Sequence, residues 1–514
     1  MVLRYYGICL HLYLIQKINK MYSNKGRLFL IITFFFLILL LFLQLFSQHW
    51  TSRLDQDTVV LYNSLLVANN IQQEYLDHPS FSLFLVNGIF LKLASFIGIL
   101  DIKFITKLKF IDDFDNKFQH AFYLLKLISL FIFFLSIFVF SKIMKKLNFS
   151  STHITISILF LVTNYYFISA FFSLRSEPIA VLFFLISLYF LLRFNTNQKY
   201  ISLIFFSVFM VLSLLAKIQL IINYFFLICF LILSCKDYKV IDIPEFLNDK
   251  KNIFLFNLLF LIVFSVLVFF LTSKDRYTDL LILEKYFTIL FILSFIVSLM
   301  NNKIRSSEFF LNLNHFFFLI VIGISLSLTT IFLLDFFEVI AFNPRVFLRL
   351  IFPIHYLTHF SYFNPIEQMF NTFTKDFPTF VYFTFNVVFG FIYFLRNHNK
   401  NFFKEKKLLI FLFLILIISF ISSLFRDFYF YIIIYISLIC SNLFFINRTK
   451  IFHLIFIFVF STNIILNFNY FKGLVPLNDN IDLICKNKND VREYMKYWHQ
   501  RFDDNFLDKF CLIK

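Results

Sequence analysis

Long apolar runs separated by short polar segments follow one another along almost the whole chain. Most runs approach the roughly twenty residues that cross a bilayer as a helix. Backbone groups in hydrocarbon must find hydrogen-bond partners within their own segment, so such runs predict helices and not an open sheet. The alternating pattern of a membrane barrel is missing from the sequence. We therefore predict an all-α, polytopic transmembrane helical bundle.

The same pattern predicts about thirteen membrane spans. They lie near 28–46, 121–141, 152–172, 178–193, 200–215, 218–234, 252–272, 278–299, 315–334, 378–395, 408–424, 428–446 and 451–468. One further apolar stretch, 81–100, is interrupted by Asn87, Gly88 and Lys92. We interpret this stretch as an interfacial helix in the loop that follows the first span.

Charged residues orient these spans. A basic segment precedes the first span, and no small-residue cleavage site follows that span, which indicates a signal anchor with a cytoplasmic N-terminus. Lysines and arginines then recur in alternate loops, for example Lys142, Lys145 and Lys146 after the second span. We predict a cytoplasmic segment at 1–27, a transmembrane bundle at 28–468 and an outer C-terminal tail at 469–514. Two long outer loops, 47–120 and 335–377, lie within the bundle.

Composition supports a membrane protein and narrows its class. The chain is 60% hydrophobic and 15% charged, whereas a soluble domain has about 25% charged residues. The net charge of +17 is explained by topology signals beside the spans, so we expect no nucleic-acid partner. Only 7 glycines occur in 514 residues, which disfavours a transporter built on broken helices. In an outer tail, Cys485 and Cys511 would meet an oxidising environment and could pair.

The most organised polar feature is the first outer loop. Asp55 and Asp57 follow the first span closely, and Asp77 and His78 precede the predicted interfacial helix. A carboxylate at the membrane surface can act as a general base toward a hydroxyl. Two acidic groups can instead hold a divalent cation through oxygen ligands. The structural alternative is a solvated acidic loop.

Four short motifs carry a resemblance to a known family. They are the Asp after the first span, followed in the same loop by YLDHP at 75–79, then LRSEP at 174–178, LLAK at 214–217 and RDFYF at 426–430. In this order the chain resembles the GT-C superfamily of glycosyltransferases, similar to the protein O-mannosyltransferases and the lipid A aminoarabinose transferases. The commonest family form has Asp-Glu after the first span, whereas this chain has Asp-Gln-Asp at 55–57. Both aspartates therefore stay candidates, with a slight preference for Asp57.

The resemblance implies a membrane enzyme that transfers a sugar from a polyprenyl phosphate to an acceptor hydroxyl, with inversion. Asp57 or Asp55 would be the general base. Lys217, Arg175 and Arg426 would bind the leaving phosphate. Glu177 and Asp77 would bind substrate or a cation, and His78 would shape the loop or act as a ligand or base. The structural alternatives are a snorkelling anchor for Lys217, a surface ion pair with Asp427 for Arg426, and a helix-start charge for Glu177.

The expected location is a bacterial inner membrane, with the active site facing the periplasm. The expected partners are the lipid bilayer, a polyprenyl-phosphate-linked sugar donor and a glycan, lipid or protein acceptor. One alternative is an O-antigen polymerase or ligase-like enzyme, which usually carries its key arginines in a late loop. Another is a lipid or glycan transporter, for which we expect charged residues deep in several helices. The first alternative is disfavoured because the most organised polar feature is the loop after the first span. The second is disfavoured because Lys285 and Asp335 lie close to span ends.

Overall fold

A computed structural model describes thirteen parts of the chain: 49–50, 57–74, 80–106, 113–164, 174–217, 220–234, 308–341, 377–396, 407–423, 435–440, 485, 501–502 and 504–513. The chain divides into two compact units, Met1–His49 with Pro476–Asn478, and Trp50–Val475 with Asp479–Lys514. Apart from His49, every described residue belongs to the second unit. Its elements are all helices, so the described residues confirm the predicted all-α class.

Seven described helices coincide with predicted spans. They are α5 (Phe114–Lys146), α8 (Ser176–Asn197), α9 (Tyr200–Ala216), α10 (Ile221–Ser234), α14 (Glu308–Phe336), α18 (Phe377–Arg396) and α20 (Lys407–Ser423). Helix α6 (Ser151–Thr163) covers the first half of an eighth span. Three stretches among these residues are long and apolar enough to cross a membrane, namely Phe114–Lys146, Ser176–Asn197 and Leu319–Phe336. The complete set of thirteen stays a prediction, because 28–46, 252–272, 278–299 and 451–468 lie outside the described residues.

The first outer loop contains one helix that the sequence pattern did not predict. Helix α3 (Val59–Ala68) is buried along its whole length and packs against α4 (Phe81–Phe96), the helix expected within 81–100. Two polar side chains of α3 are satisfied inside the helix, since Asn63 and Ser64 donate to the carbonyls of Val59 and Val60. A short segment that is buried on every side has no polar face, so helical periodicity does not reveal it.

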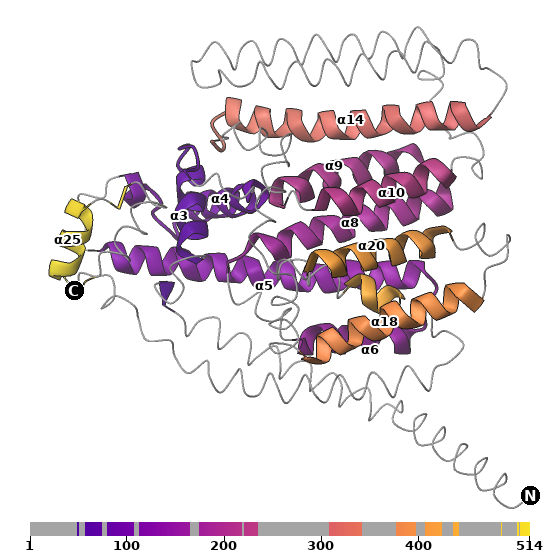
Figure 1. Ribbon diagram of the computed structural model, residues 1–514. Coiled ribbons are helices and arrows are strands. Elements are labelled where there is room, and N and C mark those ends of the chain that lie inside the picture. The colour runs from indigo at the N-terminus through magenta and orange to yellow at the C-terminus, as the bar shows by residue number, and fades with distance from the viewer. Residues whose placement is uncertain are drawn as a thin grey trace, which may run out of the picture. The chain divides into compact units, whose positions relative to one another are not determined.

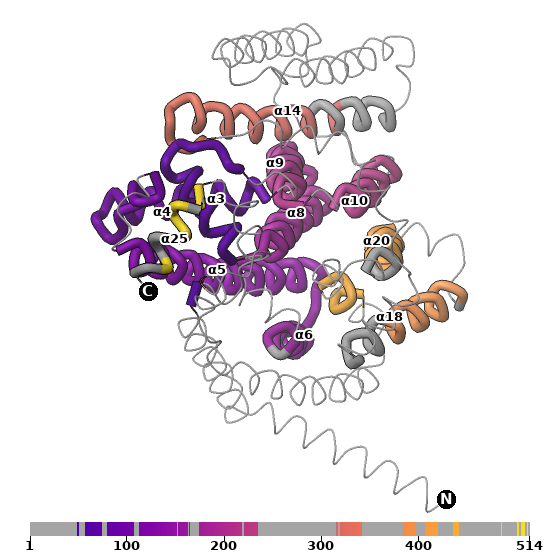
Figure 2. The backbone as a smooth tube through the Cα atoms, turned by 60° about the vertical axis from the view of Figure 1, so that its left-hand side comes forward, coloured from indigo at the N-terminus to yellow at the C-terminus, as the bar shows by residue number. Residues whose placement is uncertain are grey.

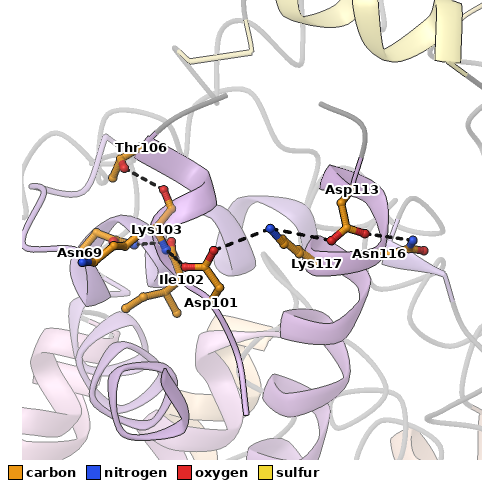
Figure 3. A network of polar contacts seen from close by, with 8 residues as sticks. All are labelled: Asn69, Asp101, Ile102, Lys103, Thr106, Asp113, Asn116 and Lys117. Carbon is orange, nitrogen blue, oxygen red and sulfur yellow. Dashed lines mark hydrogen bonds and ion pairs between the residues drawn. The ribbon is translucent and has the colours of Figure 1, made fainter. Parts of the chain in front are cut away.

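A polar network joins the end of this loop to the start of α5 (Figure 3). Lys117 lies 3.7 Å from Asp101 and 3.8 Å from Asp113, two aspartates on either side of the turn. The Asn69 amide donates to the Ile102 carbonyl at 2.8 Å, which ties the end of α3 to the 3₁₀ helix η3 (Lys103–Thr106). Because these contacts are exposed, they contribute little to stability.

Helix α9 packs against both α8 and α14 and lies between them (Figures 1 and 2). Serine side chains bridge α8 and α9: Ser187 donates to the Phe206 carbonyl at 3.0 Å and Ser213 to the Ala180 carbonyl at 2.9 Å. Such short polar contacts between helices are typical of membrane bundles, where apolar side chains alone gain little by leaving lipid. They fix the alignment of α8 against α9.

The contact between α14 and α9 depends on Gly323, and Gly323→Val should loosen it. An added Cβ would lie 2.5 Å from the Ile204 carbonyl oxygen and 2.5 Å from the Ser207 Cβ. Because backbone cannot yield cheaply, we expect a loss of about 1–3 kcal/mol in thermal or denaturant unfolding of the purified protein. Leu326→Phe is the control, since Leu326 is exposed on the same helix. Equal stability of both variants would contradict this packing.

Candidate functional site

Asp57 lies at the start of α3 and is almost fully buried, with 1% of the residue exposed. Its Oδ2 atom lies 3.0 Å from the Lys126 ammonium on α5. Its Oδ1 atom accepts a hydrogen bond of 2.6 Å from the backbone N–H of Leu174, just before α8. The carboxylate therefore connects three parts of the chain that are remote in sequence: the first outer loop, α5 and the turn into α8.

Lys126, the partner of Asp57, was not among the residues predicted from the sequence. This lysine lies inside the predicted span 121–141 and is fully buried, with its ammonium 4.7 Å from the centre of the Phe122 ring. A fully buried lysine is costly without an opposite charge, and the Asp57 carboxylate provides it. A charged residue within an apolar run was a visible signal. The identity of its partner was not, because nothing local links 126 to 57.

A second buried ion pair joins α8 to α9. The Lys217 ammonium lies 3.1 Å from the Glu177 carboxylate, and the two side chains are 9% and 11% exposed. Glu177 belongs to the first turn of α8, and Lys217 directly follows the last residue of α9. Because α8 and α9 are joined by a short connection and pack together, the start of the first helix meets the end of the second. This topology brings the motif at 174–178 to the motif at 214–217.

The segment 174–177 links the two pairs. Leu174 contacts Asp57, Arg175 precedes the first residue of α8, and Glu177 contacts Lys217. The Arg175 guanidinium also interacts electrostatically with the Glu177 carboxylate. Arg175 is partly exposed. Two carboxylates, two ammonium groups and a guanidinium thus gather from α3, α5, α8 and α9, with positive charge in excess. We refer to Asp57, Lys126, Arg175, Glu177 and Lys217 as the polar cluster.

Four other candidates cannot be placed. Asp55, Asp77, His78 and Arg426 lie outside the described residues. Within the described part of the chain, no group of three or more His, Cys, Asp or Glu residues is arranged to hold a metal ion. The polar cluster itself contributes two carboxylates that are each engaged by a lysine, so it offers no ready cation site.

The C-terminal tail contacts the first outer loop. Cys485 and Cys511 form a disulfide, the pairing that the sequence left open, and Cys511 belongs to α25 (Asp504–Ile513). Phe502 and Phe506 pack against Phe114 at the start of α5, with ring centres 5.8 and 4.9 Å from its own. Figures 1 and 2 both show α25 beside this end of α5. The tail is therefore attached to the same part of the bundle that carries Asp57.

Glu74 provides polar contacts between the C-terminal tail and α3. Its carboxylate accepts a 2.7 Å hydrogen bond from the Tyr62 hydroxyl and lies 3.6 Å from the Arg501 guanidinium. The Arg501 backbone N–H donates to the same hydroxyl at 3.3 Å. Burial, with a smaller effect of the Glu74 charge, raises the pKa of Tyr62 far above its usual range. The phenol therefore stays neutral and remains a hydrogen-bond donor to Glu74.

Comparison of the chain with protein-family models, with curated proteins and with solved structures finds no match. The family resemblance accordingly depends on the short motifs themselves. Three of them, at Asp57, 174–178 and 214–217, are neighbours in the fold although they are remote in sequence.

Proposed function

We propose that this chain is an integral membrane glycosyltransferase. It moves a sugar from a polyprenyl-phosphate carrier to the hydroxyl of an envelope glycan, lipid or protein on the outer face of a bacterial inner membrane. The observation that carries the proposal is that Asp57, one of the two candidate aspartates, meets the motifs at 174–178 and 214–217 in one polar cluster. Asp57 reaches the turn at 174–178 through Leu174, and that turn reaches Lys217 through Glu177.

The cluster suits a reaction whose leaving group is a lipid phosphate. Negative charge develops on the phosphate as its bond to the anomeric carbon breaks, so cationic groups must be in place beforehand. Arg175 is partly exposed and can bind phosphate oxygens with two parallel hydrogen bonds. Lys217 adds a second positive charge, oriented by Glu177. In this proposal Arg175 and Lys217 bind the phosphate, and Glu177 positions Lys217.

The base must take the proton of the acceptor hydroxyl as its oxygen attacks the anomeric carbon. That oxygen forms the new bond, the phosphate leaves with the electrons of the old one, and a single displacement inverts the configuration. Asp57 is poorly suited to this role, because both of its carboxylate oxygens are engaged and it is buried. We therefore propose Asp55 as the base, with Asp57 as a positioning residue.

Sugar transfer by the purified protein from a labelled polyprenyl-phosphate sugar tests the proposal. We expect Asp55→Asn to lower turnover by about 10²–10⁴-fold, the usual contribution of a general base. Asp101→Asn is the matched control, since that aspartate belongs to the same loop but is exposed and pairs only at the surface. Wild-type turnover in Asp55→Asn would show that Asp55 is not the general base. Absence of transfer by the wild-type protein would refute the proposed reaction.

A second candidate is a lipid or glycan transporter, which the buried Asp57–Lys126 pair favours. Lys126 is a fully buried charge within α5 that was not predicted from the sequence. Ionisable residues inside a membrane bundle often mark a transport path. Liposomes that contain the labelled lipid separate the two functions. A transporter moves the lipid between leaflets and leaves its sugar–phosphate bond intact, whereas the enzyme breaks that bond only when an acceptor is present.

A further inference from the structure

The Asp57–Lys126 ion pair is almost completely buried. Lys126 is 0% exposed and Asp57 is 1% exposed. On the predicted topology, about 24 Å of α5 separates Lys126 from the cytoplasmic end at Lys142, at a rise of 1.5 Å per residue. In a hydrocarbon core of roughly 30 Å, this places Lys126 in the outer part of the membrane. Neither charge is stable there alone, so the pair must form as a unit.

Stability by itself gives no reason for this pair. Two apolar side chains of similar volume usually replace a buried ion pair without loss, because they avoid the cost of removing two charges from water. What apolar side chains cannot do is accept a hydrogen bond. Asp57 accepts one from Leu174, whose backbone lies in a turn and outside any helix. The anionic carboxylate therefore specifies where the turn before α8 lies.

The position of this turn decides where the cationic groups point. Arg175 is the next residue along the chain, and Glu177, two positions later, contacts Lys217. Lys126 acts on this segment through Asp57, because its ammonium contacts one carboxylate oxygen while the other accepts from Leu174.

We infer that Lys126 is a positioning residue of the polar cluster: through its contact with the buried Asp57 carboxylate it fixes the 174–177 segment that presents Arg175 to a phosphate-bearing lipid. This inference rests on the proposed function for the identity of the ligand. The geometric part of the inference does not depend on the proposed function, and a structural measurement can test it alone.

The first test is transfer kinetics in Lys126→Met, Lys126→Arg and the neutral pair Lys126→Met/Asp57→Leu. We expect the neutral pair to fold, with a modest loss of stability because the Leu174 N–H loses its acceptor. Its KM for the lipid donor should rise about tenfold, because Arg175 loses its fixed position. Lys126→Arg should restore part of the donor affinity lost in Lys126→Met. Lys142→Met, on the exposed face of the same helix, should match the wild type. Wild-type kinetics in the neutral pair would overturn the inference.

The second test needs no enzyme activity. A cysteine placed by Arg175→Cys, in protein whose Cys9, Cys229, Cys235 and Cys440 are replaced by Ala, reports the geometry of the turn through its rate of labelling by a polar thiol reagent. We expect the neutral pair to change this rate at least about fivefold and Lys142→Met to leave it unchanged. If the wild-type protein transfers no sugar, the glycosyltransferase proposal fails while this rate still decides the role of Lys126. An unchanged rate in the neutral pair would show that the segment is fixed by other contacts.

Discussion

Lys217→Met destabilises the protein by about 3–5 kcal/mol in unfolding of the detergent-solubilised chain, because it leaves the Glu177 carboxylate buried without its partner. The two side chains are 9% and 11% exposed, so water cannot replace the lost ammonium. Arg175 acts on the same carboxylate and compensates in part, which places the expected cost at the lower end of this range.

The double variant Lys217→Met/Glu177→Gln separates stability from function. Removing both charges should recover most of the lost stability, since no unpaired ion is left in the bundle. Sugar transfer should not recover, because the phosphate still lacks one of its two proposed cationic partners and keeps only Arg175. Lys117→Met is the matched control: it breaks an ion pair whose side chains are 36% and 56% exposed, and should cost less than about 1 kcal/mol. A double variant as unstable as the single one would refute the pairwise account.

Loss of the Cys485–Cys511 disulfide is expected to have the next largest effect. The two cysteines are separated by 26 positions, and a loop of this size gives about 3–4 kcal/mol by the chain-entropy relation. Cys485→Ser/Cys511→Ser should therefore release the tail. Limited proteolysis would then cleave near Arg501 at a rate well above that of the wild type, as it would after treatment of the wild type with a thiol reductant.

Cys229→Ser provides the comparison, since Cys229 is a free cysteine. It should leave the proteolysis rate unchanged with and without reductant. The disulfide also tests topology. Structural disulfides persist in oxidising compartments, so a bond formed in intact cells would agree with the predicted outer tail. Quantitative labelling of both cysteines as free thiols in intact cells would place the tail on the other side.

The helical class could be predicted from the sequence because each apolar run contains the cause of its own structure. A segment that meets hydrocarbon must satisfy its backbone internally, and this requirement is local. Helices α8 and α9 were therefore predicted close to their observed bounds, whereas α5 and α14 begin well before the predicted starts at 121 and 315. Helix α3 was not, since it is short and is buried along its whole length.

The candidate site was less predictable, because its contacts join residues far apart in sequence. The motifs at 174–178 and 214–217 identified Arg175, Glu177 and Lys217 as polar residues at helix ends. That Glu177 meets Lys217 follows from the packing of α8 on α9. Lys126 carried a local signal as a charge inside an apolar run. Its partner Asp57 belongs to another part of the chain, and one sequence contains no record of such a pairing.

By itself, the sequence determined that this protein is helical, that it is apolar enough to occupy a membrane and that its first loop is rich in acidic residues. These properties follow from hydropathy and charge, which each segment carries independently of its neighbours. Only the tertiary structure decided which charges are paired. A buried charge must find an opposite one, and the partner that Asp57 finds on α5 makes it a buried connector of three elements rather than an exposed acid at the membrane surface.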